Sequence, residues 1–454
     1  MEYTPWALLS DAGLIAALLV TGTLVRAHVP IVQRLMLPAS VIAGFLGLLL
    51  GPHVLGVLPF SGQLGTYSSV LIAVVFACLP LTDTMGLRGA GRQTGAFSLY
   101  SIGMYALQVG LGMAFALLVL APVWDTPDGF GILLVGGWAG GFGSAAALSA
   151  AFGDTWPEAA SLGFASATVG MLVGIIGGIA VSNWGVRRGH TARGGGLAEL
   201  PEELRTGLVR DPERRPSLGT ATSSASSIEP LALQLCVVGA VAATAYGIQA
   251  WFGGLFPRFT LPVFALAFVT GLLLRLALRR TPAWGYLDPA TLRGISGTAT
   301  DVLIVCGIAS IVPGFVQGFW LPLVLLFVLG LALCFVLFRV VAPAMFSTNW
   351  FEKAVFTWGW STGAVATSIA LLRMVDPDLR TRTLEEFGIA YLPLAPLETA
   401  TIAFAPAIIM AGAGWALGGG WTALGLIALA LPWVLGWTTR SRGRGARPDR
   451  VPAG

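Results

Sequence analysis

Two stretches of the chain, residues 136–149 and 357–368, are apolar overall but rich in glycine and in side-chain hydroxyl groups. Glycine lets the backbone turn, and carbonyl and hydroxyl oxygens near the turn can then approach a cation. A helix that restarts after the turn exposes N–H groups, which attract a carboxylate. These stretches, with the arginine that follows the second, supply the candidate substrate-binding residues: Gly141, Gly143, Ser144, Ser361, Thr362, Thr367, Ser368 and Arg373.

Each candidate also has a simpler explanation. Small residues permit close packing of helices in a membrane interior. Arg373 could clamp a carboxylate through two hydrogen bonds. The charged residues that follow it, from Asp376 to Glu386, equally favour a solvated cytoplasmic loop for this arginine.

Glu398 is the ionisable residue with the strongest indication of a position inside the membrane. It lies in the apolar run 387–410, where Pro393 and Pro396 loosen the predicted helix and free backbone carbonyls. A charge at the centre of a bilayer costs about 2.5–3.5 kcal/mol on insertion scales. Glu398 could therefore coordinate sodium, carry a coupling proton, or pair with Arg373. An ion pair that only holds two helices together is the alternative.

Further polar side chains are candidate ion ligands. Thr168 lies in the small-residue run 166–170, although its hydroxyl could simply bond back within its own helix. Asp301 stands near the start of a predicted span at residues 298–311, and Asp83 lies beside Thr82 and Thr84, so both carboxylates are expected near a membrane interface. We predict ion-coupling roles for Thr168, Glu398 and Asp301.

Catalytic and metal chemistry have little support in the sequence. The three histidines lie in or near connections and form no cluster, and the four cysteines stand singly in apolar runs, which predicts buried structural thiols. No nucleophile with a base is evident, so we predict no enzyme, no cofactor and no metal site. Lys353 is the only lysine, and no phosphate-binding Gly-x-x-x-x-Gly-Lys motif is present. A channel would need a continuous polar pore, whereas this chain offers two isolated stretches.

The composition indicates that the elements holding these residues are transmembrane helices. Hydrophobic residues make up 56% of the chain, charged residues only 11%, and the mean hydropathy is +0.80. Uncharged runs such as residues 96–123, 231–251, 321–338 and 421–437 reach or approach the length that crosses a bilayer. We predict an all-α polytopic membrane protein with about 11 transmembrane helices and two re-entrant hairpins.

Basic residues set the predicted orientation. The net charge of +4 is spread over short connections and forms no face for nucleic acid. Arginines fall on alternate connections, which the positive-inside rule places in the cytoplasm. We therefore predict a multi-pass protein of the inner cell membrane, with its N-terminus outside the cell and its C-terminus in the cytoplasm. The opening segment, residues 6–25, lacks a basic start and contains Asp11, so we interpret it as a retained span.

The chain divides into two similar halves. Residues 1–184 form the first predicted membrane repeat, with a hairpin near 130–151, and residues 230–413 form the second, with a hairpin near 347–373. The polar segment 185–229 is predicted to be a flexible cytoplasmic linker, and residues 414–454 an extra helix with an arginine-rich tail. Leu37-Pro38 and Leu261-Pro262 open corresponding apolar runs. An odd number of spans in the first half makes the repeats inverted, which supports alternating access.

Several runs resemble the bacterial sodium/glutamate symporter family. They are VGGWAGGFGSAA at residues 135–146, ATVGMLVGIIGG at 167–178, LMLPASVIAG at 35–44 and the LPL of residues 392–394. The resemblance covers roughly residues 11–412. It implies a secondary transporter that couples Na⁺ to uptake of glutamate or a related small amino or carboxylic acid, with the lipid bilayer as its environment and a possible homodimer.

The chain departs from this family at three points. Members typically carry Gly-Gly-His-Gly-Thr, whereas residues 140–144 read GGFGS, with Phe142 in place of the histidine. In the second hairpin, members typically carry threonine and asparagine, whereas residues 367–374 read TSIALLRM. Glu398 stands near where members place an aspartate. The chain is therefore interpreted as a divergent member. A proton-coupled carrier of a different organic anion is the alternative, ahead of a membrane-embedded enzyme.

Overall fold

The computed structural model describes residues 4–82, 91–191, 202–255, 261–363, 365–377 and 379–438, and every regular element within them is helical. Eight of the described helices are long and apolar enough to cross a membrane. They are α1 (Pro5–His28), α4 (Leu64–Thr82), α5 continued by η1 and α6 (Arg92–Trp124), α9 (Ala159–Arg188), α11 (Pro230–Leu255), α13 (Pro289–Ala309), α15 continued by η6 and α16 (Trp320–Met345) and α21 (Gly414–Val434). The all-α, polytopic class predicted from the sequence is confirmed.

The predicted count of about 11 spans is not reproduced by these long helices. Two apolar helices, α3 (Ala39–Leu50) and α12 (Val263–Leu278), have 12 and 16 residues and are shorter than a straight crossing requires. A further span is bent by 52° between α19 (Thr383–Ala390) and α20 (Leu394–Met410). The described helices therefore give eight spans, or nine when the bent pair counts as one.

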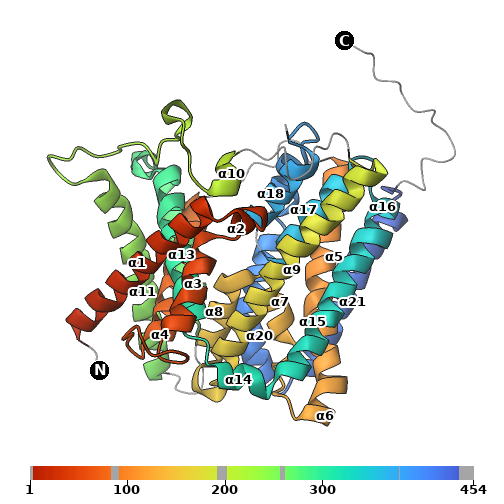
Figure 1. Ribbon diagram of the computed structural model, residues 1–454, viewed down its shortest axis with the longest axis horizontal. Helices are drawn as coiled ribbons and strands as arrows, with labels where there is room; N and C mark the ends of the chain where they lie inside the picture. Colours follow the sequence, from red (N-terminus) through yellow and green to blue (C-terminus); the bar gives the residue numbers. More distant parts are fainter. Residues whose placement is uncertain are drawn as a thin grey trace.

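The helices form two groups that lie side by side (Figure 1). The first bundle consists of α1, α3, α4, α11, α12 and α13, which pack mainly on one another. The second bundle contains α5, α9, α15, α20 and α21 together with two broken helices. These are the pair α7 (Ile132–Gly137) and α8 (Gly141–Phe152), and the pair α17 (Trp350–Thr362) and α18 (Val365–Val375). The bundles meet where α8 packs on α4 and α13, and where α9 packs on α13.

The two halves share an irregular turn in the same place. The long helices that precede each broken pair contain a π-helical turn, at Ala116–Leu120 and at Leu337–Val341. Each turn is followed by Ala-Pro, in the helices α6 (Ala121–Trp124) and α16 (Ala342–Met345). Proline lacks an N–H and crowds the carbonyl four residues earlier, so a locally wider helix relieves the conflict. This shared detail adds to the sequence signal for an internal repeat.

Part of the polar connection between the halves is anchored. Helix α9 extends to Arg188 and ends at Gly189, whose φ of +68° suits glycine, so the helix runs past the predicted boundary at residue 184. Farther on, Thr222 Oγ1 donates to the Tyr286 carbonyl over 2.8 Å, and the Thr220 N–H donates to Asp288 Oδ2 over 3.1 Å. Residues 192–201, which include predicted linker glycines, lie outside the described part of the chain.

The cysteine prediction holds at three of four positions. Cys78, Cys306 and Cys334 are buried free thiols. Cys236 is a free thiol but is exposed, so the prediction of burial is wrong there. It lies on α11, an outer helix with only four buried residues, and apolar residues on such a helix can face lipid.

Candidate functional site

The two predicted breaks in the backbone lie against each other. The first separates α7 from α8, and Gly141 at the start of α8 has a φ of +61°. The second follows α17, which ends at Thr362 and is capped by Gly363. A Cβ atom on Gly141 would lie 2.9 Å from the Gly363 carbonyl oxygen, so only glycine permits this approach. Segments far apart in the sequence thus form one site.

Helix α9 holds the two breaks together. A Cβ on Gly170 would lie 2.6 Å from the Thr362 carbonyl oxygen and 2.7 Å from Cδ1 of Trp138, the residue that follows α7. A Cβ on Gly174 would lie 2.7 Å from Thr362 Oγ1. On the same helix, Ser166 Oγ donates to the Leu133 carbonyl of α7 over 2.7 Å. The small residues of α9 therefore pack closely and also determine where the site forms.

The hydroxyl groups of the site are buried and bonded within their own helices. Thr362 Oγ1 and Ser361 Oγ donate to the Trp358 carbonyl over 2.7 and 3.3 Å, and Thr168 Oγ1 donates to the Phe164 carbonyl over 2.8 Å. The bond of Thr168 is the back-bonding expected as an alternative. A hydroxyl that donates in this way keeps oxygen lone pairs for a cation. Ser144, on α8, is 5% exposed.

The remaining candidates on α18 differ in their distance from the break. Ser368 is fully buried and packs on α17, where a Cβ on Gly359 would lie 2.8 Å from Ser368 Cα. Thr367 is partly exposed. Arg373 lies inside α18 and not in a loop, so the loop interpretation is wrong. Eight residues of helix, about 12 Å, separate Val365 from Arg373, so the structure does not bring this arginine to the break.

Glu398 lies on α20, a helix that packs on α8. Its Oε2 accepts a hydrogen bond of 2.6 Å from the Tyr391 hydroxyl, which stands at the bend between α19 and α20. The bend next to Pro393 agrees with the predicted loosening of this span. Glu398 bonds to Tyr391 and not to Arg373, so the predicted ion pair with Arg373 is not found.

Comparison with known proteins decides the family. Residues 8–377 match a family model described as sodium/glutamate symporter. The chain belongs to the sodium/glutamate symporter family. The match includes both helix breaks and ends before Glu398 and α20. No curated protein matches the chain. Membership in this family, with the long apolar helices, makes the chain a multi-pass membrane protein of a transporter family.

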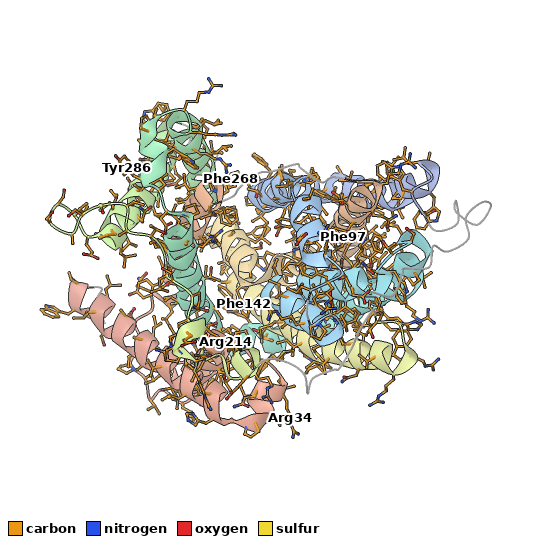
Figure 2. The ribbon with its side chains drawn as sticks, turned by 90° about the horizontal axis from the view of Figure 1, so that it is seen from above. Arg34, Phe97, Phe142, Arg214, Phe268 and Tyr286 are labelled. Carbon is orange, nitrogen blue, oxygen red and sulfur yellow. The ribbon has the colours of Figure 1, made fainter. Side chains whose placement is uncertain are left out.

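Phe142, which replaces a histidine typical of sodium/glutamate symporters, lies between the two bundles. Seen from above, it is near the centre of the molecule, whereas Phe268 is on the first bundle and Phe97 on the second (Figure 2). Its side chain is buried in the main hydrophobic core. The next residue, Gly143, is partly exposed and faces α4, where a Cβ would lie 3.2 Å from Ile72 Cδ1. The start of α8 therefore lies at the boundary between bundles.

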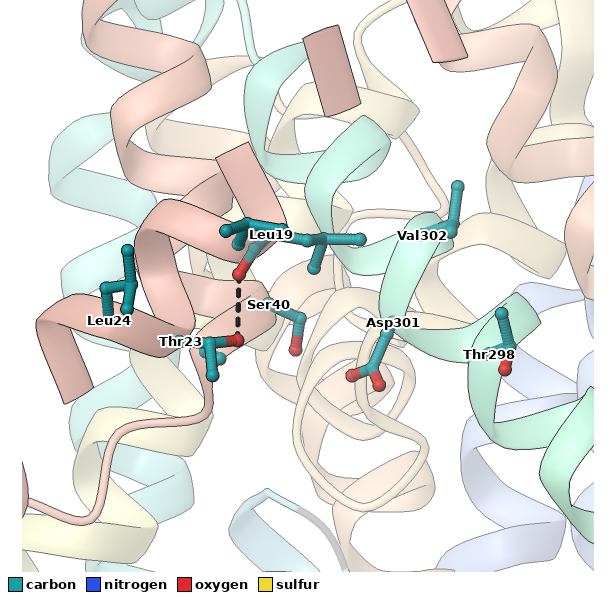
Figure 3. Close-up of a pocket in the computed structure, with 9 residues that line it drawn as sticks. Leu19, Thr23, Leu24, Ser40, Thr298, Asp301 and Val302 are labelled. Carbon is teal, nitrogen blue, oxygen red and sulfur yellow. Dashed lines mark hydrogen bonds between the residues drawn. The ribbon is translucent and has the colours of Figure 1, made fainter. Parts of the chain in front are cut away.

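Asp301 is not part of this site. Helix α13 begins at Pro289, so Asp301 is in its middle and not near its start as predicted. Its side chain is exposed to a cavity between α1, α3 and α13 (Figure 3). Asp83 and Thr84 lie outside the described residues, and Thr82 is the last residue of α4. In the described part of the chain, no group of three or more His, Cys, Asp or Glu side chains could hold a metal ion.

Sequence reasoning missed two polar residues at the breaks. Gln108 on α5 is fully buried, and its Nε2 donates to the Ser361 carbonyl over 2.7 Å, while its Oε1 has no hydrogen-bond partner. Trp138 Nε1 is also buried without a partner. Buried polar atoms are rarely left unpaired, so these two suggest places for ligand or water. Gln108 is the only amide in the apolar run 96–123, which is the signal that could have found it.

Proposed function

We propose that this protein is a secondary active transporter that couples Na⁺ to uptake of glutamate or a related small amino or carboxylic acid. The observation that carries the proposal is the approach of Gly141 to the Gly363 carbonyl on the surface of α9. Broken helices that meet inside a membrane protein leave backbone N–H and C=O groups free for ligands. Family membership supports the same class of function.

The two ends of the broken helices suit opposite charges. The N-termini of α8 and α18 present N–H groups and a positive dipole end, which favour a substrate carboxylate. The C-terminal carbonyls of α17 and the oxygens of Ser361 and Thr362 suit Na⁺. Ser144, Gly143, Thr367 and Ser368 remain substrate-binding candidates because they lie on these two helices. Arg373 lies at the far end of α18, so its proposed role is limited to attracting the substrate as it approaches the site.

Two groups near the site are proposed for ion coupling. Thr168 lies on α9 and Glu398 on α20, and both helices pack on α8. Glu398 could coordinate sodium or carry a proton, and the second role would make the protein a proton-coupled carrier of another organic anion. No catalytic role is proposed for either group. Asp301 is left out because it lies in a separate cavity.

The two bundles provide a basis for alternating access. Both breaks belong to the second bundle, which contacts the first mainly through α8 and α9. We propose that the second bundle moves against the first and that the halves are inverted repeats with the N-terminus outside. The described linker residues 202–229 and the tail are then cytoplasmic. A homodimer through the first bundle in the cell membrane is the assembly that the family resemblance implies.

The proposal is tested by uptake of radiolabelled L-glutamate into proteoliposomes. An inward Na⁺ gradient and a pH gradient are imposed separately on the native protein, on Glu398→Gln and on Glu385→Gln. Glu385 is a suitable control because its side chain is 75% exposed. Sodium-driven uptake that is lost only in Glu398→Gln supports the proposal. Absence of uptake under both gradients by folded protein would reject glutamate as the substrate, and uptake under the pH gradient alone would reject sodium coupling.

A further inference from the structure

A cavity of about 370 Å³ lies in the first bundle, between α1, α3 and α13 (Figure 3). All of its described lining residues come from these three helices, so it is separate from the helix breaks. Val20 and Leu24 line it and are 60% and 54% exposed. Because exposed apolar residues of a membrane protein face lipid, the cavity opens toward the bilayer.

The cavity contains one acidic group and no basic one among its described lining residues. Figure 3 shows the Asp301 carboxylate directed toward Ser40. Asp301 is twelve residues beyond Pro289, which places it about 18 Å along α13 and deep in the bilayer. A carboxylate at such a depth costs about 2.5–3.5 kcal/mol unless a partner compensates the charge. The described chain supplies no cation for it here.

Ser40 is the polar neighbour of this carboxylate in the cavity. Its side chain is 1% exposed, and its Oγ has no hydrogen-bond partner of regular geometry although it lies beside the carboxylate. The other two hydroxyls are already bonded, Thr23 Oγ1 to the Leu19 carbonyl over 2.8 Å and Thr298 Oγ1 to the Gly294 carbonyl over 2.9 Å. The Ser40 hydroxyl and the Asp301 carboxylate therefore lie next to each other and border the same space, and none of the described lining residues supplies a cation to this carboxylate.

The size and lining of the cavity identify the kind of ligand. A water molecule occupies about 30 Å³, so the cavity could hold roughly twelve of them, far more than a bare metal ion needs. Small-molecule pockets start at about 300 Å³ and are mostly apolar with a few polar groups. Apart from Asp301 and three hydroxyl residues, the lining is apolar: Leu19, Val20, Leu24, Ala39 and Val302.

We propose that this cavity binds a lipophilic primary ammonium ion that enters from the bilayer. The ammonium group donates hydrogen bonds to the Asp301 carboxylate and to Ser40 Oγ, and the alkyl chain lies along α1 toward Val20 and Leu24. The ligand neutralises the embedded charge while its apolar part fills the remainder of the cavity.

The test measures binding of tritiated octylamine to the purified protein in nanodiscs by scintillation proximity. Asp301→Asn keeps the shape of the side chain and removes its charge, and should weaken octylamine binding at least about tenfold. Ser40→Ala should weaken it several-fold. Thr298→Phe keeps the carboxylate and fills the cavity, and should also abolish binding. Glu229→Gln, an exposed carboxylate elsewhere on the chain, should bind like the native protein.

Competition separates the ammonium from its alkyl chain. Unlabelled octylamine should displace the label, whereas octanol at the same concentration should not. Equal binding by Asp301→Asn, or equal displacement by octanol, would overturn the proposal because it would show partition of the alkyl chain only. Displacement by sodium at millimolar concentration would overturn it in favour of an ion site. Gel filtration of each variant checks folding. If Asp301→Asn does not fold, the loss of binding in Thr298→Phe is the test of the proposal.

Discussion

Gln108 on α5 and Ser361 at the end of α17 are joined by a hydrogen bond of 2.7 Å from the side-chain Nε2 to the backbone carbonyl. The last four carbonyls of a helix have no donor within that helix, so this one depends on an outside partner. Because α5 belongs to neither broken pair, the bond fixes the second break to a continuous helix. Gln108 therefore acts as a positioning residue in the proposed site.

Gln108→Leu should destabilise the protein by about 1–3 kcal/mol, because the Ser361 carbonyl then stays buried and unpaired. The break should also lose its fixed position, so the sodium concentration for half-maximal uptake should rise several-fold. Thermal unfolding and sodium titration of uptake measure the two effects. Gln93→Leu is the matched control, since Gln93 is on the same helix and makes only a 3.4 Å bond to Trp437. Equal behaviour of the two variants would contradict the assignment.

Lys353 and Glu386 join α17 to α19 through an ion pair of 2.8 Å. The lysine side chain is fully buried, the glutamate side chain is 28% exposed, and the Lys353 Nζ lies 5.3 Å from the ring centroid of Phe346. Removing the carboxylate leaves a buried ammonium, while removing the ammonium leaves a carboxylate that water can reach. Glu386→Gln should therefore lower the unfolding temperature more than Lys353→Met.

The double variant separates pairing from other effects of these substitutions. If the unpaired ammonium is what destabilises Glu386→Gln, adding Lys353→Met to that variant should raise its unfolding temperature toward that of Lys353→Met alone. Strictly additive losses in unfolding temperature, or a larger loss in Lys353→Met alone, would show that the ion pair is not the stabilising feature.

Asp288 connects the linker to the start of α13. Its Oδ2 accepts bonds from the Thr291 N–H over 2.8 Å, from Thr291 Oγ1 over 2.6 Å and from the Thr220 N–H over 3.1 Å. The Thr291 hydroxyl bond, and next the backbone N–H bonds, hold the pKa of this carboxyl below its ordinary value. Because the pKa is lower in the folded state, the ionised carboxyl stabilises the fold at pH values above the unfolded pKa of about 3.9. This stabilisation is lost as pH falls through the folded pKa.

Asp288→Asn should therefore unfold at a lower temperature than the native protein at neutral pH. Because the native carboxyl is protonated only at acidic pH, the difference should stay constant down to about pH 5 and shrink below about pH 4. Unfolding temperatures measured across this range check the prediction. Asp211→Asn is the control, since Asp211 caps only a three-residue helix in the exposed linker. A difference that grows on acidification would contradict the assigned sign.

The sequence predicted local breaks better than long-range partners. Glycine content indicated both breaks, because glycine adopts backbone angles that other residues avoid, as Gly141 does with its φ of +61°. The partners of Gln108 and Lys353 lie far away in sequence, on α17 and α19, and only the packing brings them together. The start of α13 was missed although Asp288-Pro289 is a typical helix start, since hydropathy alone favoured a later residue.

The contact between the breaks gives the sharpest mutational test. Gly141 and Gly153 both have positive φ, +61° and +51°, but only Gly141 lacks room for a side chain. Gly153 combines its positive φ with a ψ of −134°, so Gly153→Ala carries only the cost of an unfavourable backbone conformation, about 1–3 kcal/mol. Gly141→Ala adds a collision with the Gly363 carbonyl, which should separate α8 from α17 and reduce sodium-driven uptake at least about tenfold. Proteoliposome uptake per folded molecule compares the two. Similar uptake by both variants would mean that transport does not depend on contact between the breaks.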